Sequence, residues 1–455
     1  MHIHLGIEGV LPWALYLGMW VSFFLSMLWR PQIGLYILAF ALPMQTGRYK
    51  LQPFLLGPQF VDLLILGVIL GLLFKGRSII ESLPSNRILL FMALFLYLSL
   101  WEGAFFADAP LPIWITDPRF SNWKNYVEMF FLALLVASTL TTKKQVQTLI
   151  VVMCLSVLVV NRNYYSLLAD RDLSHFSYDI RDAGLLGYAG VNGFAAFEAM
   201  FCVFLIGMLP FIKRITARLG ILAVLVTGIY CLLFAFSRGG YIGFLVGIIT
   251  VGLLKSRKYL VIAFLIIFSW QTLLPTAVQQ RISMTTESSG SGQFDSSSEE
   301  RLTLWRDALD MFERNPVTGT GFNTYEFMHR VGSYRDTHNY YLKVLAETGI
   351  VGMILFLLLL RMLFVSGWSL YRASDDPFWS AIATGFTALV VCGIVLNFFG
   401  DRWSYQQVDG YLWMLLGTVL RGQIEVNASA PEDSTPHALS ASSDQAEHSL
   451  HVVVA

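Results

Sequence analysis

The sequence predicts an all-α fold: a polytopic bundle of transmembrane helices. Hydrophobic residues make up 55% of the 455 residues and charged residues only 14%. The mean hydropathy of +0.59 excludes a soluble domain of this length. Apolar runs that suit membrane-spanning helices of about 20 residues recur along most of the chain. Together these observations predict about 12 spans.

The apolar runs define the predicted order of the spans. Residues 1–170 contain the runs 10–29, 32–45, 58–74, 88–106, 126–141 and 146–160. Residues 171–365 contain 184–212, 219–236, 240–254, 259–275 and 340–364, and residues 366–421 contain 378–399 and 408–420. A long polar loop, 276–338, separates two of these runs. The tail 422–455 is rich in Ser, Ala, His and acidic residues and lacks aromatic residues, which predicts a disordered cytoplasmic extension.

The positions of the basic residues predict the orientation, although the net charge is zero. Lys and Arg cluster in short loops that are expected to be cytoplasmic: 75–77, 143–144, 213–214, 255–258 and Arg372. The alternating loops then face outward: 107–125, 161–183, 237–240, 276–338 and 400–407. The side of the amino terminus depends on whether the number of spans is even or odd, and both alternatives stay open.

The long outer loop is predicted to contain a helix of its own. Ser297 followed by Glu300 forms a capping box, and Asn315-Pro316 ends the helix. Five apolar residues follow at helical spacing: Leu302, Trp305, Ala308, Leu309 and Phe312. Such a helix either lies on the membrane and roofs a cavity or packs on neighbouring loops. The glycine-containing turn 318–323 that follows is either a phosphate cradle or a plain turn.

Three polar residues at the outer ends of apolar runs are candidates for chemistry. His338 lies just before the run 340–364, where an imidazole can move a proton between water and a membrane-anchored substrate. Arg181 and Arg238 also lie at the ends of spans, and a guanidinium fork suits bidentate binding of phosphate. Salt bridges, contact with lipid headgroups and helix capping are the structural alternatives for these three residues.

The sequence predicts no metal site and no cofactor. All four cysteines fall inside predicted spans, and their spacing matches no redox or metal motif. The outer loops contain no Asp-x-Asp pair and no His/Cys ligand spacing. Charge that develops in a reaction would therefore be neutralised by cationic side chains of the protein.

Several short motifs follow one another between residues 180 and 360: Arg181 with Gly184, Gly187 and Asn192-Gly193, then Ser237-Arg238-Gly239-Gly240, Arg301 with Trp305, Asn315-Pro316, and Thr337-His338-Asn339-Tyr340 with Glu347 and Gly349. In this order they resemble the O-antigen ligase and polysaccharide polymerase superfamily of bacterial membrane glycosyltransferases. Val191 stands where the family often has proline. The first 170 residues contribute only hydropathy to the resemblance.

The resemblance implies a GT-C-like glycosyltransferase in the bacterial inner membrane, with its active site facing the periplasm or exterior. It implies inverting transfer of a glycan from undecaprenyl diphosphate to an acceptor hydroxyl, without metal or nucleotide sugar. His338 would be the base, and Arg181 and Arg238 would hold the diphosphate. Asn339 and the neighbouring Tyr340 and Tyr341 would line the sugar site.

The acceptor and the class of activity stay open. The acceptor is a second lipid-linked glycan, a lipid A core or a protein hydroxyl, and a flippase and a chain-length regulator are the expected partner proteins. No nucleic-acid partner is expected. A transporter or flippase of lipid-linked glycans is the alternative from another class. Glu347, about 180° around the helix from His338, is expected to be a packing residue rather than a second base.

Overall fold

The computed structural model describes residues 10–290, 296–332 and 336–428, and every regular element in them is a helix. The amino-terminal helices are α1 (Leu11–Leu28), α2 (Gln32–Ala41), α3 (Gln45–Tyr49), α4 (Phe60–Phe74), α5 (Ser85–Phe106), α6 (Pro118–Thr139) and α7 (Lys143–Leu168). The middle of the chain forms η2 (Tyr178–Ile180), η3 (Gly184–Ala189), α8 (Gly190–Met208), η4 (Leu209–Phe211), α9 (Ile215–Phe234), α10 (Arg238–Leu254) and α11 (Lys258–Leu273). The remaining helices are α12 (Thr276–Gly290), α13 (Ser296–Arg314), α14 (Thr324–Met328), α15 (Tyr340–Ala373), α16 (Pro377–Leu396), η5 (Asn397–Phe399) and α17 (Gln406–Ala428). The all-α prediction is confirmed.

Local sequence explains where several of these helices begin. Asp117 and Asp376 each cap a helix whose first residue is proline, α6 and α16, by accepting a hydrogen bond from a backbone N–H. Thr142 and Gln145 form a reciprocal capping box at the start of α7. Ser237 caps α10 through the N–H of Gly240. These caps satisfy N–H groups that a helix leaves unpaired at its amino end.

Seven helices in the described residues are long and apolar enough to cross a membrane: Leu11–Leu28, Ser85–Phe106, Lys143–Leu168, Gly184–Phe211, Ile215–Phe234, Tyr340–Ala373 and Pro377–Phe399. An eighth is obtained if Lys258–Leu273 and Thr276–Met284, which meet at 107°, form one broken span. Three further apolar helices, α2, α4 and α10, are shorter. The protein therefore has the predicted transmembrane bundle, but the predicted number of about 12 spans is not confirmed.

Helix α8 is the centre of the bundle. Every residue from Gly193 to Met208 is buried, and α9, α10 and α16 pack against this helix. At the crossing with α16, a Cβ on Gly207 would lie 2.6 Å from the Cα of Gly385. Two glycines thus let the two backbones approach more closely than larger side chains would allow, as is common between membrane helices.

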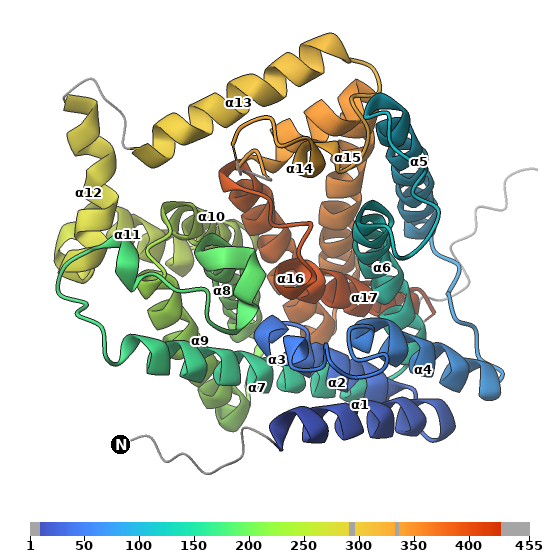
Figure 1. Ribbon diagram of the computed structural model, residues 1–455. Helices are drawn as coiled ribbons and strands as arrows, with labels where there is room; N and C mark the ends of the chain where they lie inside the picture. The colour runs from blue at the N-terminus through green and yellow to red at the C-terminus, as the bar shows by residue number, and fades with distance from the viewer. Residues whose placement is uncertain (1–9, 291–295, 333–335, 429–455) are drawn as a thin grey trace, which may run out of the picture.

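The remaining helices form two opposite sides around this core (Figure 1). Helices α1 to α4 and α7 lie along one side, and α13 crosses the other side above α14 and α15. The carboxy-terminal helix α17 packs mainly on α6 and continues to Ala428, past the start of the predicted tail at residue 422. Residues 429–455 of that tail lie outside the described residues.

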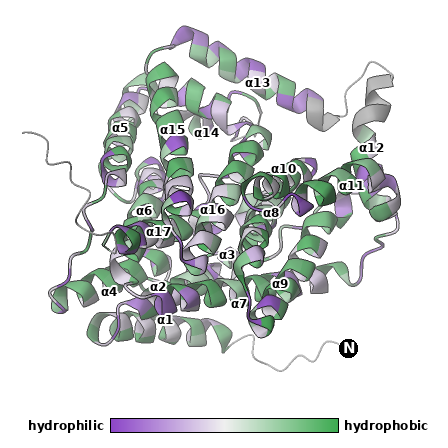
Figure 2. Cartoon of the chain, turned by 180° about the vertical axis from the view of Figure 1, so that it is seen from behind, coloured by the Kyte–Doolittle hydropathy of each residue, from purple (hydrophilic) through white to green (hydrophobic). Residues whose placement is uncertain are grey.

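The predicted helix of the long loop is present as α13, and it ends at Arg314, just before Asn315-Pro316. Its buried face consists of Leu304, Ala308 and Met311, which pack on α14 and the first turns of α15. Leu309, predicted to belong to the apolar face, is 40% exposed. The other face is largely hydrophilic (Figure 2). Of the two predicted alternatives, the helix therefore packs on neighbouring elements. Its buried stripe is rotated from the predicted one.

Candidate functional site

Helix α15 is broken near its start, and the glycine turn of the outer loop fills the break. Gly349 has φ of +60°, a conformation that favours glycine. The N–H groups of Thr320 and Gly321 donate to the carbonyls of Ala346 and Glu347, at 3.1 and 2.7 Å. Since the turn's N–H groups bind α15, they do not form a phosphate cradle. The turn is a structural joint.

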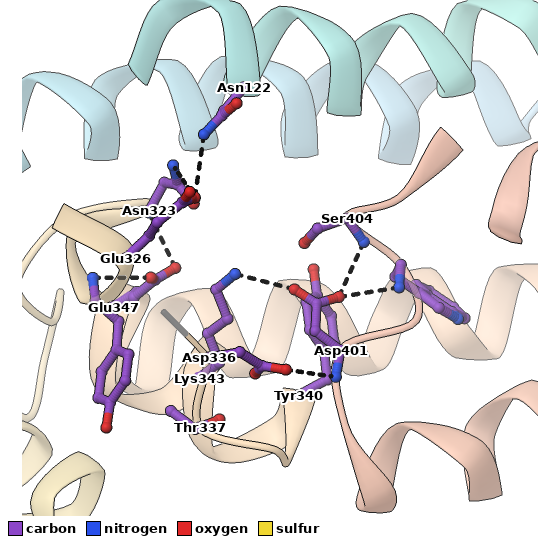
Figure 3. A network of polar contacts seen from close by, with 12 residues as sticks. Asn122, Asn323, Glu326, Asp336, Thr337, Tyr340, Lys343, Glu347, Asp401 and Ser404 are labelled. Atoms are coloured by element: carbon purple, nitrogen blue, oxygen red, sulfur yellow. Dashed lines mark hydrogen bonds and ion pairs between the residues drawn. The ribbon is translucent and has the colours of Figure 1, made fainter. Parts of the chain in front are cut away.

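Glu347 fastens this joint from inside. Its carboxylate is 2% exposed and accepts hydrogen bonds from the backbone N–H groups of Asn323 and Tyr325, at 2.9 and 3.1 Å (Figure 3). Both donors belong to the start of α14. The expectation that Glu347 is a packing and hydrogen-bonding residue is confirmed.

Asn339, Tyr340 and Tyr341 form the first turn of α15. The Asn339 side chain caps the helix by accepting from the N–H groups of Tyr341 and Leu342. The Tyr340 hydroxyl donates to the Tyr126 hydroxyl at 2.9 Å, and the Tyr341 hydroxyl donates to the carbonyl of Ile394 at 2.8 Å. Each of these three residues thus has a structural contact, and the assignment of a sugar-binding role to them stays a prediction.

His338 occupies a left-handed backbone conformation, with φ of +53°, which is uncommon outside glycine and often marks functional sites. Its Nδ1 lies 3.5 Å from Oδ2 of Asp336, and its side chain is 35% exposed. Burial alone would raise the pKa of Asp336, but the contact with His338 and the charges of Lys343 and Arg402 lower that pKa to about 2. Asp336 is therefore a carboxylate at neutral pH.

A carboxylate that faces Nδ1 favours the proton on that nitrogen and leaves the lone pair on Nε2. His338 can then accept a proton at Nε2 and form an imidazolium that Asp336 stabilises. This is the arrangement of a general base with an orienting carboxylate.

A buried ion pair holds Asp336 in place. Lys343 Nζ and Asp401 Oδ2 are 2.9 Å apart, with side-chain exposures of 7% and 1%. The other oxygen of Asp401 accepts from the N–H groups of Trp403 and Ser404, and the N–H of Asp401 donates to Asp336 at 3.3 Å (Figure 3). The segment before α17 is thus fixed against Asp336 and the start of α15.

Arg181 and the amino end of α10 meet at the tight turn Ala235–Ser237. The Arg181 guanidinium donates to the side-chain oxygen of Asn192 at 3.0 Å and to the carbonyl of Ala235 at 3.4 Å. The Ser237 hydroxyl donates to the same Asn192 oxygen at 2.9 Å, and Arg238 is the next residue. The structure therefore brings the two predicted arginines to one turn.

A further arginine that the sequence analysis did not select lies at this turn. Arg281 of α12 is 4% exposed, donates to the carbonyl of Phe236 at 3.3 Å and to the Tyr178 hydroxyl at 3.2 Å, and lies over the Phe176 ring. Burial, and next the charge of Arg281, lower the pKa of Arg181 to about 10. In the described part of the chain, neither Arg181 nor Arg281 has a carboxylate within ion-pair distance.

A buried and a half-buried guanidinium without a carboxylate partner among the described residues have the charge and hydrogen-bond donors to bind an anion. We call Arg181, Arg238 and Arg281 the arginine cluster. No signal in the sequence marks Arg281, because it reaches the turn 235–237 only through the 107° bend between Lys258–Leu273 and Thr276–Met284.

A polar cavity of about 330 Å³ is lined in part by the Lys343–Asp401 pair. Its walls come from α3, the starts of α4, α15 and α17, α6, η3, and the segments 322–326 and 401–405. Among the described residues that line it, none is His338 or a member of the arginine cluster. The first 170 residues, which gave no motif, supply more than half of the lining.

One family model matches part of the chain. Residues 222–357 match the family model for O-antigen ligase, a segment that includes Arg238, Arg281 and His338. The match supports the O-antigen ligase superfamily, so the resemblance noted in the sequence is confirmed. Together with the apolar helices it indicates a multi-pass membrane protein. No curated protein matches the chain.

Proposed function

We propose, from the match of residues 222–357 to the O-antigen ligase family model, that the chain is an inverting membrane glycosyltransferase with a lipid-diphosphate-linked glycan donor. The donor lipid is undecaprenyl diphosphate, and the acceptor is a hydroxyl of a glycan, a lipid A core or a protein. We further propose that the protein lies in the bacterial inner membrane, with this site facing the periplasm or exterior.

The observation that carries the proposal is the arginine cluster. The half-buried Arg181 and the buried Arg281 donate to carbonyls of the same turn, yet neither has a carboxylate partner among the described residues. A diphosphate supplies two or more negative charges and oxygen acceptors for both guanidinium forks. The negative charge of the diphosphate increases when its bond to the sugar breaks, so this site would stabilise the leaving group more than the bound donor.

The His338–Asp336 pair supports the other half of the reaction. The acceptor hydroxyl would give its proton to Nε2 of His338 while its oxygen forms a bond to the anomeric carbon of the donor sugar. The bond between that carbon and the diphosphate oxygen breaks, and the lipid diphosphate leaves with the electron pair. Attack from the side opposite the leaving group inverts the anomeric configuration.

Reconstitution tests the proposal directly. The purified chain in liposomes, given a lipid-diphosphate-linked oligosaccharide and the candidate acceptors, should form a glycosylated product and release lipid diphosphate. Arg281→Lys should lower the rate by about 10²-fold, because a point charge does not replace the bidentate fork. Arg314→Lys is the matched control, since Arg314 is an exposed residue of α13.

Two results would contradict the proposal. One is movement of the lipid-linked glycan across the bilayer without any product, which would identify a transporter. The other is equal product from the Arg281→Lys and Arg314→Lys variants, which would separate the arginine cluster from the chemistry.

A further inference from the structure

We infer that the cavity between α3, α4, α6 and α17 binds an uncharged sugar residue of the acceptor glycan. This inference rests on the proposed function only in assigning the sugar to the acceptor substrate. The cavity volume of about 330 Å³ is at the low end of ligand pockets, which span about 300–1,000 Å³. It therefore suits a sugar unit rather than a long polymer segment.

The lining has the chemistry of a sugar site. Amide side chains, which donate and accept hydrogen bonds as sugar hydroxyls do, are numerous: Gln45, Gln52, Asn122, Asn125, Asn323, Gln406 and Gln407. Aromatic rings that offer an apolar face with a polar tip stand beside them: Tyr49, Tyr126, Tyr188 and Tyr405. The rings of Tyr188 and Tyr405 are 6.1 Å apart.

Part of the lining is already ordered by contacts within the protein. The Gln45 side-chain oxygen accepts from the Gln407 amide at 2.9 Å and from the backbone N–H of Tyr188 at 2.8 Å. The Gln406 amide donates to Glu128 at 3.0 Å. These contacts join α3, η3, α6 and α17 into one wall, so the cavity is formed before any ligand enters.

Other groups in the lining keep hydrogen-bonding capacity for a ligand. Arg48 Nε is buried without a hydrogen-bond partner, which is costly unless a ligand or water supplies an acceptor. In the residues that the structure describes, the Asn125 amide group and the Tyr405 hydroxyl make no hydrogen bond to the protein. These three groups come from three different elements and can contact one sugar unit.

The charges of the lining favour a neutral ligand over a diphosphate. Three basic side chains line it, Arg48, Lys124 and Lys343, against four acidic ones, Asp62, Glu128, Glu326 and Asp401. Lys124 pairs with Asp62 and Glu128, and Lys343 pairs with Asp401. The four acidic groups outnumber the three basic ones, and two of the basic groups are already paired, so the lining offers no excess positive charge to an added anion.

The position of the cavity assigns the sugar to the acceptor. Asp401 and Lys343 form part of its wall, and Asp401 also contacts Asp336, the partner of His338. The base and the cavity thus share one ion pair, whereas the arginine cluster lies at the turn before α10. A sugar in the cavity would present its chain toward the imidazole that accepts the hydroxyl proton.

The test measures sugar binding without any reaction. Ligand-observed NMR titrations of the full chain in detergent use the methyl glycosides of glucose, galactose and N-acetylglucosamine, together with methyl glucuronide and inorganic pyrophosphate. At least one neutral glycoside should saturate with a millimolar Kd. Asn125→Ala and the conservative Tyr405→Phe should each weaken that binding by about tenfold, the loss expected for one or two hydrogen bonds. The exposed amide variant Asn427→Ala, at the far end of α17, is the matched control and should bind as the wild type does.

The inference is overturned if none of the neutral glycosides saturates, if methyl glucuronide binds more tightly than they do, if pyrophosphate displaces them, or if Asn125→Ala and Tyr405→Phe bind them like the control. Transfer assays separate this inference from the proposed function. Product formation with an unchanged acceptor KM in both variants would contradict the sugar site but not the transfer reaction. Sugar binding that depends on Asn125 and Tyr405, without product from any acceptor, would contradict the transfer reaction but not the sugar site.

Discussion

The buried Lys343–Asp401 pair should be one of the strongest single contributions to the stability of the site. Lys343→Met keeps the length of the side chain but leaves the Asp401 carboxylate, 1% exposed, without its cation. Removing one member of a buried pair costs about 3–5 kcal/mol. Asp401 would retain hydrogen bonds from the N–H groups of Trp403 and Ser404, so we expect the lower end, about 3 kcal/mol.

Thermal unfolding in detergent, followed by tryptophan fluorescence, measures this loss, and Trp403 lies next to the pair. A loss of about 3 kcal/mol corresponds to a fall in Tm on the order of 3–6 °C. The double variant Lys343→Met with Asp401→Asn removes both charges and should be less destabilised than the sum of the two single variants.

The control is Arg314→Met, which breaks an exposed pair with Asp310 on α13, with side-chain exposures of 68% and 42%. Exposed pairs contribute about 0.2–1 kcal/mol at most, so its Tm should hardly change. The reasoning is refuted if Lys343→Met falls no further than Arg314→Met, or if the two single losses add fully in the double variant.

Three further predictions follow from local geometry and topology. Gly349→Ala places a Cβ 2.3 Å from a backbone oxygen at a φ of +60°, so it should lower the free energy of unfolding by about 2 kcal/mol or more. In the control Gly220→Ala, the new Cβ meets no atom within 4 Å, so the Tm should be unchanged. The pKa of Asp336 is held at about 2, below its ordinary value of 3.8. The stability that its carboxylate contributes is therefore present above pH 3.8 and is lost only as the pH falls toward 2. Asp336→Asn should slow transfer by about 10-fold to 10²-fold at every pH between about 6 and 8, and an effect confined to acidic pH would contradict this. In intact cells, a cysteine at Thr303 should react with a membrane-impermeant maleimide and one at Arg214 only after permeabilisation, and the reverse pattern would place the site on the cytoplasmic side.

The sequence was sufficient for the fold class because composition and apolar runs report directly on burial in a membrane. It was less accurate for the number of spans. Helices α2, α4 and α10 are apolar but short, and hydropathy does not separate a short spanning helix from one that is buried inside the protein. The face of α13 was also misassigned, because packing on α14 and α15, rather than mean apolarity, decides which stripe is buried.

The candidate site was predictable only where a motif marks it. His338, Arg181 and Arg238 stand at the ends of apolar runs, and a charged residue there is conspicuous. Arg281 lies in a polar loop sequence without such a mark, and its role follows from the bend between α11 and α12. The cavity was not predictable either, because residues as distant in sequence as Arg48 and Tyr405 form it.

The most direct test of the central claim compares two histidines in the same outer loop. His338 and His329 both have positive φ, +53° and +46°, and asparagine tolerates this conformation, so His→Asn at either position changes the chemistry without new backbone strain. Product formation from the lipid-diphosphate donor is then measured at equal amounts of folded protein. We predict that His338→Asn lowers the rate by about 10²–10⁴-fold, the usual contribution of a general base, and that His329→Asn retains the wild-type rate. Equal rates for the two variants would contradict the assignment of His338 as the base.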